Sequence, residues 1–263
     1  MKMKIIGLLA LLGMWGLLGC GEDKNPIQSG MGEIRMLLVD GPTTGVEAVN
    51  LVVTEVSVHQ AGLDTVSGWT VIDNTTRSFD LMTLTNGASA VLGDKELSPG
   101  HYTQIRLKLG AGSTVVVKGE SHPLEVPSGA QTGLKLTHEF DIAANTLYEL
   151  MVDFDAARSI HATGQTYKMA PTLRVVAKVN SGTLSGTVSP VDARALVTAV
   201  VGTDTVSTAA DTANGAFKLM ALPAGTYTVH IAPSTAAYQD TTLAGVVVVV
   251  QQNTPVGTIV LHP

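Results

Sequence analysis

Residues 150–155 read Leu-Met-Val-Asp-Phe-Asp. Successive side chains of an extended strand point to opposite faces, so Leu150, Val152 and Phe154 share one face. Asp153 and Asp155 share the other face. This pattern is typical of a β-strand that packs one face on a hydrophobic core and leaves the other face polar.

Short runs rich in Val and Thr recur along the chain, interrupted by Gly, Pro, Asn or Asp at intervals of roughly 8–12 residues. The first set of predicted strands is 33–39, 49–58, 69–72, 102–109, 114–117, 134–140, 146–154 and 173–179. The second set is 183–188, 195–201, 215–219, 225–231, 246–250 and 257–261. Residues 79–84 and 155–160 are ambiguous and are compatible with short helical turns. The pattern predicts an all-β protein made of antiparallel β-sandwiches.

The two sets divide the chain into a domain at 33–179 and a domain at 180–263. The passage 179–182 between them is too short for a free hinge, so we expect the two sandwiches to sit end to end with restricted motion.

Composition excludes several classes of protein. The chain has 263 residues, of which 45% are hydrophobic and 14% charged, with a formal net charge of −6. This hydrophobic content is incompatible with a disordered chain. The acidic balance and the absence of a Lys/Arg cluster give no sign of nucleic-acid binding. The single cysteine excludes an intramolecular disulfide.

The N-terminus combines Lys2 and Lys4 with an apolar run at 5–18 that ends at Gly19-Cys20. This run has the length of a signal-peptide core and is shorter than the ~20 residues of a membrane-spanning helix. The arrangement resembles the lipobox of bacterial lipoproteins. The resemblance implies a signal peptide at 1–19, cleavage between Gly19 and Cys20, and acylation of Cys20, which would anchor the chain to a membrane.

Residues 20–32 would then be the lipidated cysteine and a flexible tether. Gly21 follows the cysteine in place of the Asp that retains such lipoproteins in the inner membrane, so the resemblance implies a cell-envelope location, in the outer membrane of a Gram-negative cell. Two alternatives stay open: an ordinary secretory signal that ends in cysteine, or a buried structural thiol.

Residues 33–179 resemble a bacterial family known as domain of unknown function 4382. The matching stretches are 37–42, 48–53, 79–84, 100–107, 127–135 and 152–159. The usual Asp-Ala-Pro turn of the family appears here as Asp40-Gly41-Pro42. The resemblance implies an immunoglobulin-like envelope domain and no known activity.

Residues 183–263 resemble the transthyretin-like regulatory domain of carboxypeptidases, which is grouped with carbohydrate-binding-like folds. The matching stretches are 184–188, 215–219 and 222–229. One of them, Leu-Pro-Ala-Gly-Thr-Tyr-Thr at 222–228, repeats the pattern of Leu-Ser-Pro-Gly-His-Tyr-Thr at 97–103. In both, a Tyr at the start of a strand is expected to cover the sandwich end and to bond backbone through its hydroxyl. By alternation, Tyr227 shares a face with Val229 and Ile231, whereas Tyr102 shares a face with Gln104 and Arg106.

The search for chemistry gives few candidates. The histidines lack the spacing of metal ligands, and no nucleophile–base pair or cofactor-binding loop is visible. We therefore expect no catalytic residue, no cofactor and no enzymatic activity. Asp153 and Asp155 could form one side of a calcium site together with Asp141 or Glu149. Alternatively, Arg158 pairs with one of the two and holds the turn that ends the strand.

Two aromatic residues are candidates for binding. Trp69 could stack on a sugar, but the alternative of a plug at the sandwich end is favoured. Tyr238 is the one ring of the second domain available for stacking on a glycan. Two functions follow. The first is a membrane-anchored display or protein-interaction module that meets an envelope protein, and the second is glycan binding through the second domain.

Overall fold

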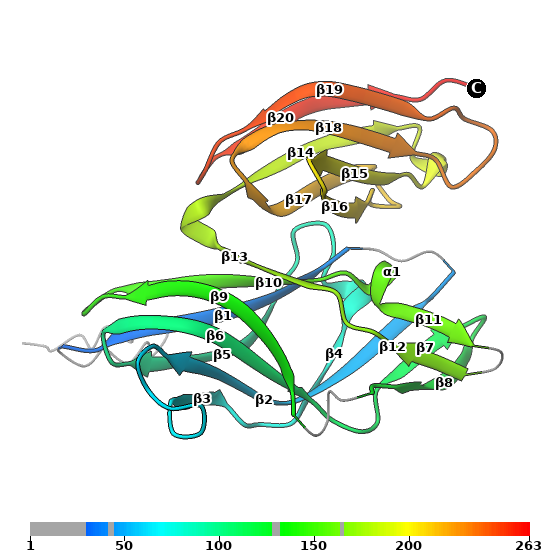
Figure 1. Ribbon diagram of the computed structural model, residues 1–263. Coiled ribbons are helices and arrows are strands. Elements are labelled where there is room, and N and C mark those ends of the chain that lie inside the picture. The colour runs from blue at the N-terminus through cyan, green and yellow to red at the C-terminus, as the bar shows by residue number, and fades with distance from the viewer. Residues whose placement is uncertain (1–29, 42–44, 128–131, 164–165) are drawn as a thin grey trace, which may run out of the picture.

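The structure is a computed structural model that describes residues 30–41, 45–127, 132–163 and 166–263 (Figure 1). Strands make up 63% of the described residues and helices 6%, so the predicted all-β fold class is confirmed. The strands form four sheets, arranged as two β-sandwiches. Cys20, Gly19 and the predicted signal peptide lie outside the described residues.

The first sandwich is built from a four-stranded and a nine-stranded sheet. The smaller sheet has the order β13-β10-β1-β5. The larger has the order β11-β12-β8-β7-β2-β6-β9, with β3 and β4 paired to β2. The strands are β1 (Gly32–Asp40), β2 (Ala48–Gln60), β3 (Trp69–Asp73), β4 (Arg77–Asp80), β5 (Ala90–Leu97), β6 (Gly100–Leu109), β7 (Thr114–Val117), β8 (Glu120–Glu125), β9 (Leu134–Ile142), β10 (Leu147–Phe154), β11 (Ile160–Thr163), β12 (Thr166–Met169) and β13 (Leu173–Ala177).

The core of this sandwich lies between the two sheets and follows the alternation of the sequence. Leu150, Val152 and Phe154 of β10 are at most 1% exposed and belong to the core, which confirms the face assigned to them. Ile34 and Met36 of the neighbouring β1 are also fully buried. Burial of one face of every central strand is what fixes the register of the sheets.

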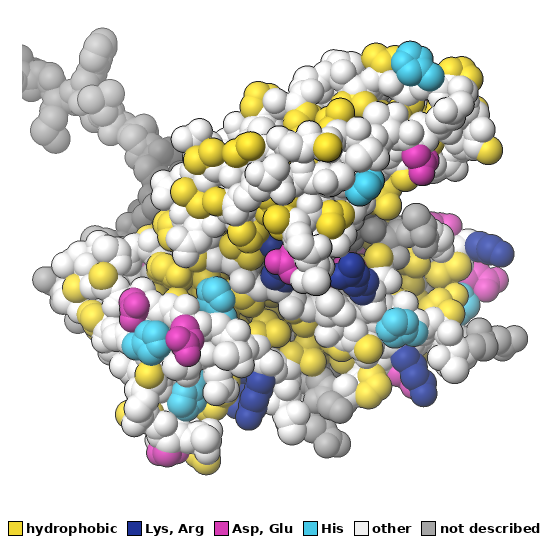
Figure 2. All heavy atoms as spheres, turned by 45° about the horizontal axis from the view of Figure 1, so that its top comes forward, with side chains coloured by type: hydrophobic (Ala, Val, Ile, Leu, Met, Phe, Trp, Pro, Cys, Tyr) yellow, Lys and Arg dark blue, Asp and Glu magenta, His cyan; other side chains and the backbone are white. Residues whose placement is uncertain are grey.

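The second sandwich is built from a three-stranded sheet, β17-β14-β20, and a four-stranded sheet, β16-β15-β18-β19. Its strands are β14 (Ser181–Ser189), β15 (Leu196–Val201), β16 (Asp204–Ala209), β17 (Ala216–Pro223), β18 (Gly225–Ala232), β19 (Thr241–Val248) and β20 (Asn253–Val260). Residues 181–263 contain six Asp, Glu, Lys and Arg side chains. Figure 2 shows the consequence: the second sandwich, in the upper part of the view, presents mostly uncharged and hydrophobic surface.

The few helical segments are single turns. The ambiguous stretches 79–84 and 155–160 hold η1 (Leu81–Thr83) and α1 (Ala156–Ser159), capped by Asp80 and Asp155 respectively. The others are η2 (Lys178–Asn180), which joins the sandwiches, and η3 (Val191–Ala193).

The sequence had predicted antiparallel sheets throughout, and this prediction is wrong for three strand pairs. β1 runs parallel to β10, β14 runs parallel to β20, and β12 runs parallel to β8. Each sandwich thus pairs its first strand with a late strand of its own. Such pairs are possible without βαβ units because the intervening chain passes through the opposite sheet.

The two sandwiches lie side by side, so the prediction that they sit end to end is wrong. Leu37, Met151 and Val176 form a row across the outer face of the four-stranded sheet. Met151 and Val176 are buried there against Ala221 of β17. Figure 1 shows the second sandwich above this sheet. The outer face is apolar at its centre, and packing the second sandwich on it removes this apolar surface from water.

The repeated tyrosine pattern has the same structure in both sandwiches. Tyr102 and Tyr227 are each 1% exposed, and each hydroxyl donates a 2.9 Å hydrogen bond to the carbonyl four residues earlier, of Ser98 and Pro223 respectively. The prediction that Tyr102 shares a face with Gln104 and Arg106 is wrong. A register shift after Tyr102 reverses the alternation, so Tyr102 points into the core and Arg106 points outwards.

Candidate functional site

The predicted carboxylate pair lies at the junction between the sandwiches, where the two members have different partners. The Asp153 carboxylate accepts a 2.7 Å hydrogen bond from the Arg174 guanidinium. Arg174 also donates to the carbonyl of Ala221 in the second sandwich at 2.8 Å. Asp155 accepts from the backbone N–H of Arg158 at 2.9 Å, and the Arg158 side chain lies 3.5 Å from its carboxylate. The pairing with Arg158 is therefore present at the turn, and Arg174 is a partner that the sequence had not indicated.

The calcium alternative would add Asp141 or Glu149 to Asp153 and Asp155, and the structure gives Asp141 and Glu149 other partners. Asp141 is bonded to His101 at 2.9 Å and Glu149 to Lys178 at 2.7 Å. In the part of the chain that the structure describes, no group of three or more His, Cys, Asp or Glu side chains could hold a metal ion. Asp153 and its Arg174 partner instead link the two sandwiches.

A third carboxyl at the junction, Asp40, escaped the sequence search. Its Oδ1 accepts a 3.0 Å hydrogen bond from the backbone N–H of Ala156, and its side chain is buried. Burial, with smaller contributions from the charges of Asp153 and Asp155, raises the pKa of Asp40 to about 9. Asp40 therefore carries a proton at neutral pH.

Gly41, which replaces the Ala of the family's Asp-Ala-Pro turn, lies close to the backbone of the second sandwich. A Cβ at this position would lie 3.1 Å from the carbonyl oxygen of Ser207 in the second sandwich. Glycine lets the two backbones approach closely. Asn86 completes the junction, because its backbone N–H donates to the Thr208 hydroxyl at 2.8 Å and its side chain to the Ala216 carbonyl at 3.2 Å.

A cavity of about 350 Å³ lies beside these contacts. Asp153, Arg174, Asp155 and Arg158 line it, and they are joined to each other in the two ion pairs described above. Of these two pairs, Asp153–Arg174 also reaches the second sandwich through the Ala221 carbonyl, so this wall of the cavity is part of the joint.

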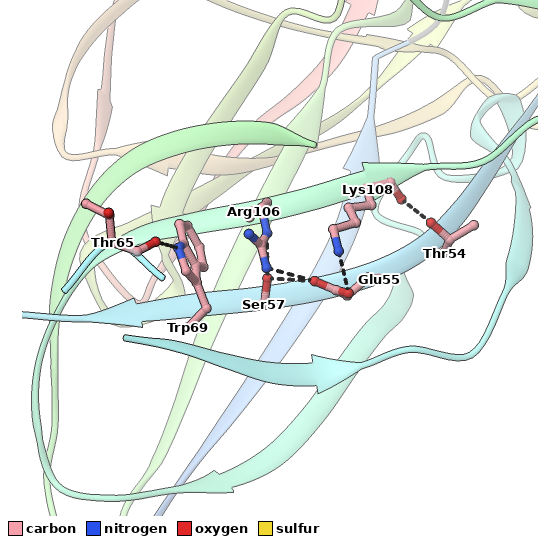
Figure 3. Close-up of polar contacts among 7 residues, drawn as sticks. All are labelled: Thr54, Glu55, Ser57, Thr65, Trp69, Arg106 and Lys108. Carbon is pink, nitrogen blue, oxygen red and sulfur yellow. Dashed lines mark hydrogen bonds and ion pairs between the residues drawn. The ribbon is translucent and has the colours of Figure 1, made fainter. Parts of the chain in front are cut away.

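The most distinctive polar cluster lies on the outer face of the nine-stranded sheet (Figure 3). The Arg106 guanidinium stands over the Trp69 ring, 4.3 Å from its centre, and the Lys135 ammonium lies 5.9 Å from it. The indole N–H donates to the Thr65 carbonyl at 3.1 Å. Both contacts to cations are in the range of cation–π interactions.

Glu55 holds the side chains of Arg106 and Lys108 in place. Its carboxylate accepts from Arg106 at 3.0 Å and from Lys108 at 2.8 Å, and Arg106 also donates to the Ser57 hydroxyl at 3.1 Å. Burial alone would raise the pKa of Glu55, but hydrogen bonds and charges from Lys108 and Arg106 outweigh it and lower that pKa. Glu55 is therefore ionised at neutral pH.

We call Trp69, Arg106, Lys135, Lys108 and Glu55 the Trp69 face. The predicted plug at the sandwich end is wrong, because Trp69 is half-buried outside the hydrophobic core and lies against Arg106. The face is assembled from β2, β3, β6 and β9, whose pairing order is not visible along the sequence.

The loop between β2 and β3 supports one edge of the Trp69 face. Asp64 accepts from the backbone N–H groups of Val66 and Ser67, both at 2.8 Å, and from the Ser67 hydroxyl. The Ser67 hydrogen bonds are the main reason that the pKa of Asp64 falls to about 2. This carboxylate is thus directed onto its own loop, which presents the Thr65 carbonyl to the indole.

Tyr238, the predicted glycan-stacking ring, has two structural contacts. It packs against the core of the second sandwich, and its hydroxyl donates to the Asp192 carboxylate at 3.0 Å. No second aromatic ring pairs with it in the described segments.

The described segments contain no helix long and apolar enough to cross a membrane.

Comparisons with solved structures give distant β-rich proteins. The Bacillus anthracis TIE protein is 15% identical over 88% of this chain, with a TM-score of 0.21, and the match spans 34% of that protein. The minor pilin GBS52 of Streptococcus agalactiae is 11% identical over 87% of this chain and 95% of its own, with a TM-score of 0.25. A putative adhesin from Bacteroides ovatus is 10% identical over 95% of this chain and 96% of its own, also with a TM-score of 0.25.

No curated protein matches the sequence. The resemblance of residues 183–263 to a carboxypeptidase regulatory domain stays a prediction. A family model described as a domain of unknown function (DUF4382) matches residues 31–171, which is more than half of the sequence. The chain therefore belongs to the DUF4382 family.

Proposed function

We propose that this protein is a non-enzymatic interaction module of the cell envelope, anchored through acylated Cys20, that binds an acidic segment of a partner protein through the Trp69 face. The observation that carries the proposal is the Arg106 guanidinium held 4.3 Å above Trp69 by Glu55. Trp and Arg are, with Tyr, the residues enriched among those that dominate protein–protein binding energies.

The charge of the Trp69 face supports an acidic partner. Residues 21–263 contain 14 Lys and Arg against 22 Asp and Glu, so the chain after Cys20 is acidic. The Trp69 face reverses this balance, because it holds three cations and one carboxylate: Arg106 and Lys108 pair with Glu55, and Lys135 lies over the Trp69 ring. A local positive surface on an acidic protein steers an acidic partner to that surface and repels it elsewhere.

The rigidity of the Trp69 face supports binding as well. Arg106 is 19% exposed and is held by a carboxylate, a hydroxyl and an aromatic ring. A side chain that is already ordered loses little conformational entropy when a partner arrives. A partner carboxylate can pair with Arg106 or Lys135 while its neighbouring apolar groups cover the indole.

Anchoring is the second part of the proposal. The basic N-terminus, the apolar run at 5–18 and the Gly19-Cys20 pair support acylation of Cys20, and Gly21 supports the outer membrane as the location. An acylated chain would hold the two sandwiches at the membrane and display the Trp69 face to other envelope proteins. Stable anchoring needs more than one lipid chain, as a diacylated cysteine provides.

Proximity labelling of the anchored protein in cells tests the proposal. We expect the wild type to label a defined acidic envelope protein, and Arg106→Glu and Trp69→Ala to lose that labelling. Lys168→Glu is the matched control, because Lys168 is an exposed cation on β12, away from the Trp69 face. Equal labelling by all four chains would contradict the role of the face.

Anchoring is tested separately with Cys20→Ser. This variant should keep its signal sequence and lack the added mass of the acyl chains. Normal processing of the variant would contradict anchoring, and it would not bear on the binding role of the Trp69 face.

A further inference from the structure

Exposed aliphatic side chains gather at one end of the molecule. Large hydrophobic residues between 38% and 56% exposed occur at the start of β10, in the linker between the sandwiches, and around the turn from β19 to β20. They are Leu147, Val179, Val247, Val249 and Val250, which we call the valine end. In Figure 1 these segments lie at the left of the view.

A groove of about 550 Å³ is lined by two members of the valine end, Leu147 and Val179, and by residues 251–253, which directly follow Val250. Leu147, Met151, Val179 and Met220 supply its apolar lining, and the turn at 251–253 closes one side. The turn is tied to the linker, because the Gln251 N–H donates to the Ser181 carbonyl at 2.7 Å. Both sandwiches thus contribute to the valine end, and residues 251–253 connect the groove to Val247, Val249 and Val250 along the chain.

Charge is sparse over the part of this surface that the second sandwich supplies. Residues 241–263 contain no Asp, Glu, Lys or Arg. The groove itself holds Lys178, Lys218 and Glu149, with Lys178 and Glu149 paired at 2.7 Å. An uncharged aliphatic surface beside a groove that holds Lys218 is compatible with lipid acyl chains and their phosphates.

The chain outside the described residues joins the structure at this same end. Glu33 of β1 lies opposite Leu147 in the sheet, and the Glu33 N–H donates to the Thr146 carbonyl at 2.8 Å. The Asn145 N–H donates to the carbonyl of Met31. From Cys20 to Gly30 the chain can span at most about 35 Å, even fully extended. An acylated Cys20 would therefore keep the valine end close to the lipid surface.

We propose that the valine end rests on the lipid bilayer and fixes the orientation of both sandwiches relative to the membrane. This inference rests on the proposed anchoring through Cys20. The lipid anchor supplies one membrane contact, and the valine end supplies a second, weaker one. Two modest contacts on one chain reinforce each other because the first raises the effective concentration of the second.

A single-cysteine label on the full, lipidated chain in phospholipid vesicles tests the orientation. Val250→Cys places a thiol at the β19–β20 turn, and Val260→Cys places one on a valine of similar type, 53% exposed, at the far end of β20. The length of β20 separates the two positions by roughly 23 Å. An environment-sensitive fluorophore on each thiol is compared with and without nitroxide-labelled lipid.

We expect blue-shifted emission and strong quenching by the lipid nitroxide at position 250, and water-like, unquenched emission at position 260. Equal, water-like emission at both positions would overturn the inference. Emission at position 250 that depends on protein density but is not quenched by lipid would also overturn it, in favour of a second copy of the chain on the valine end.

A control with the wild-type sequence, which carries neither Val250→Cys nor Val260→Cys, separates this result from the anchoring proposal. With Cys20 acylated it has no free thiol, and it should take up no label. Labelling of the wild-type chain would show that Cys20 is free, and it would overturn the anchoring proposal and this inference together. An unlabelled wild type with a water-exposed position 250 would overturn the inference alone.

Discussion

The two sandwiches share an architecture and differ in surface chemistry. Each pairs its first strand in parallel with a late strand, and each places a tyrosine hydroxyl on a carbonyl four residues earlier. Residues 33–179 contain 27 Asp, Glu, Lys and Arg side chains, whereas residues 181–263 contain six. The core requirements of a β-sandwich leave the outer faces free, so two similar frameworks can face different surroundings.

The junction shows the same division in its charged groups. The first sandwich contributes the side chains of Arg174 and Asn86, which donate to the backbone carbonyls of Ala221 and Ala216. The side chain that the second sandwich adds to these contacts is the uncharged Thr208 hydroxyl, which accepts from the Asn86 N–H. A sandwich that is poor in charged side chains can still form a polar joint, because every residue carries a backbone acceptor. The variants below test this asymmetry.

The largest effect is expected at Arg174. Arg174→Met removes the partner of Asp153 and the hydrogen bond to Ala221. Because an unpaired, largely buried carboxylate remains, we expect the free energy of unfolding to fall by about 3 kcal/mol. Urea unfolding measures this loss. Asp153→Leu in the same chain should recover part of it, and a loss below about 0.5 kcal/mol would show that the pair does not hold the joint.

A pH-dependent effect is expected at Asp40. Its pKa is about 9 in the folded protein and near 3.8 when it is exposed in the unfolded chain. Between these values folding takes up a proton, so the wild type loses stability as pH rises from about 4 to 9. Asp40→Asn removes this proton uptake, which costs about 1.4 kcal/mol per pH unit, so it should stabilise the protein by about 2 kcal/mol at pH 5.5 and give no gain at pH 3. Thermal unfolding at both pH values measures the difference, and an equal gain at both would contradict the raised pKa.

The two tyrosines should respond alike. Tyr102→Phe and Tyr227→Phe each remove one hydroxyl bond to a backbone carbonyl, and each should cost about 1 kcal/mol. Urea unfolding of the two variants provides the comparison. A cost confined to one of them would show that the shared motif has different roles in the two sandwiches.

The smallest effect is expected at Gly41. Gly41→Ala adds a methyl group 3.1 Å from the Ser207 carbonyl, and small shifts of the second sandwich can absorb it. We expect a loss of about 0.5–1 kcal/mol, together with faster amide hydrogen exchange near Ser207. Unchanged exchange there would indicate that the close approach is not needed for the joint.

The sequence predicts the fold well wherever one face of a strand is buried. Apolar alternation located β1, β2, β6, β10 and β18, whose inward residues form the cores. It missed β4, β5, β8, β11, β12 and β16, which are short, rich in polar residues or interrupted. β8 contains Pro123, for example, and it follows a turn at Lys118-Gly119 in which both residues have positive φ. Alternation carries little signal in such strands, because few of their side chains enter the core.

The candidate site was beyond sequence reasoning for a different reason. Trp69 and Arg106 are 37 positions apart, and they meet because β3 and β6 both pair with β2. The register shift after Tyr102 also reversed the expected direction of Arg106. Asp153 could be singled out as a carboxylate on a strand, but its partner Arg174 lies on β13, paired beside it in the sheet. Contacts of this kind depend on strand order, which one sequence does not reveal.

The fluorescence of Trp69 tests the central claim most directly, since Trp69 is the only tryptophan in residues 21–263. Titration of that fragment with a decaglutamate peptide should change the indole emission saturably, and the apparent Kd should rise with salt. Arg106→Gln should weaken binding at least about tenfold, which corresponds to roughly 1.4 kcal/mol. Emission that stays constant, or that responds equally to decalysine, would contradict an acidic partner on the Trp69 face.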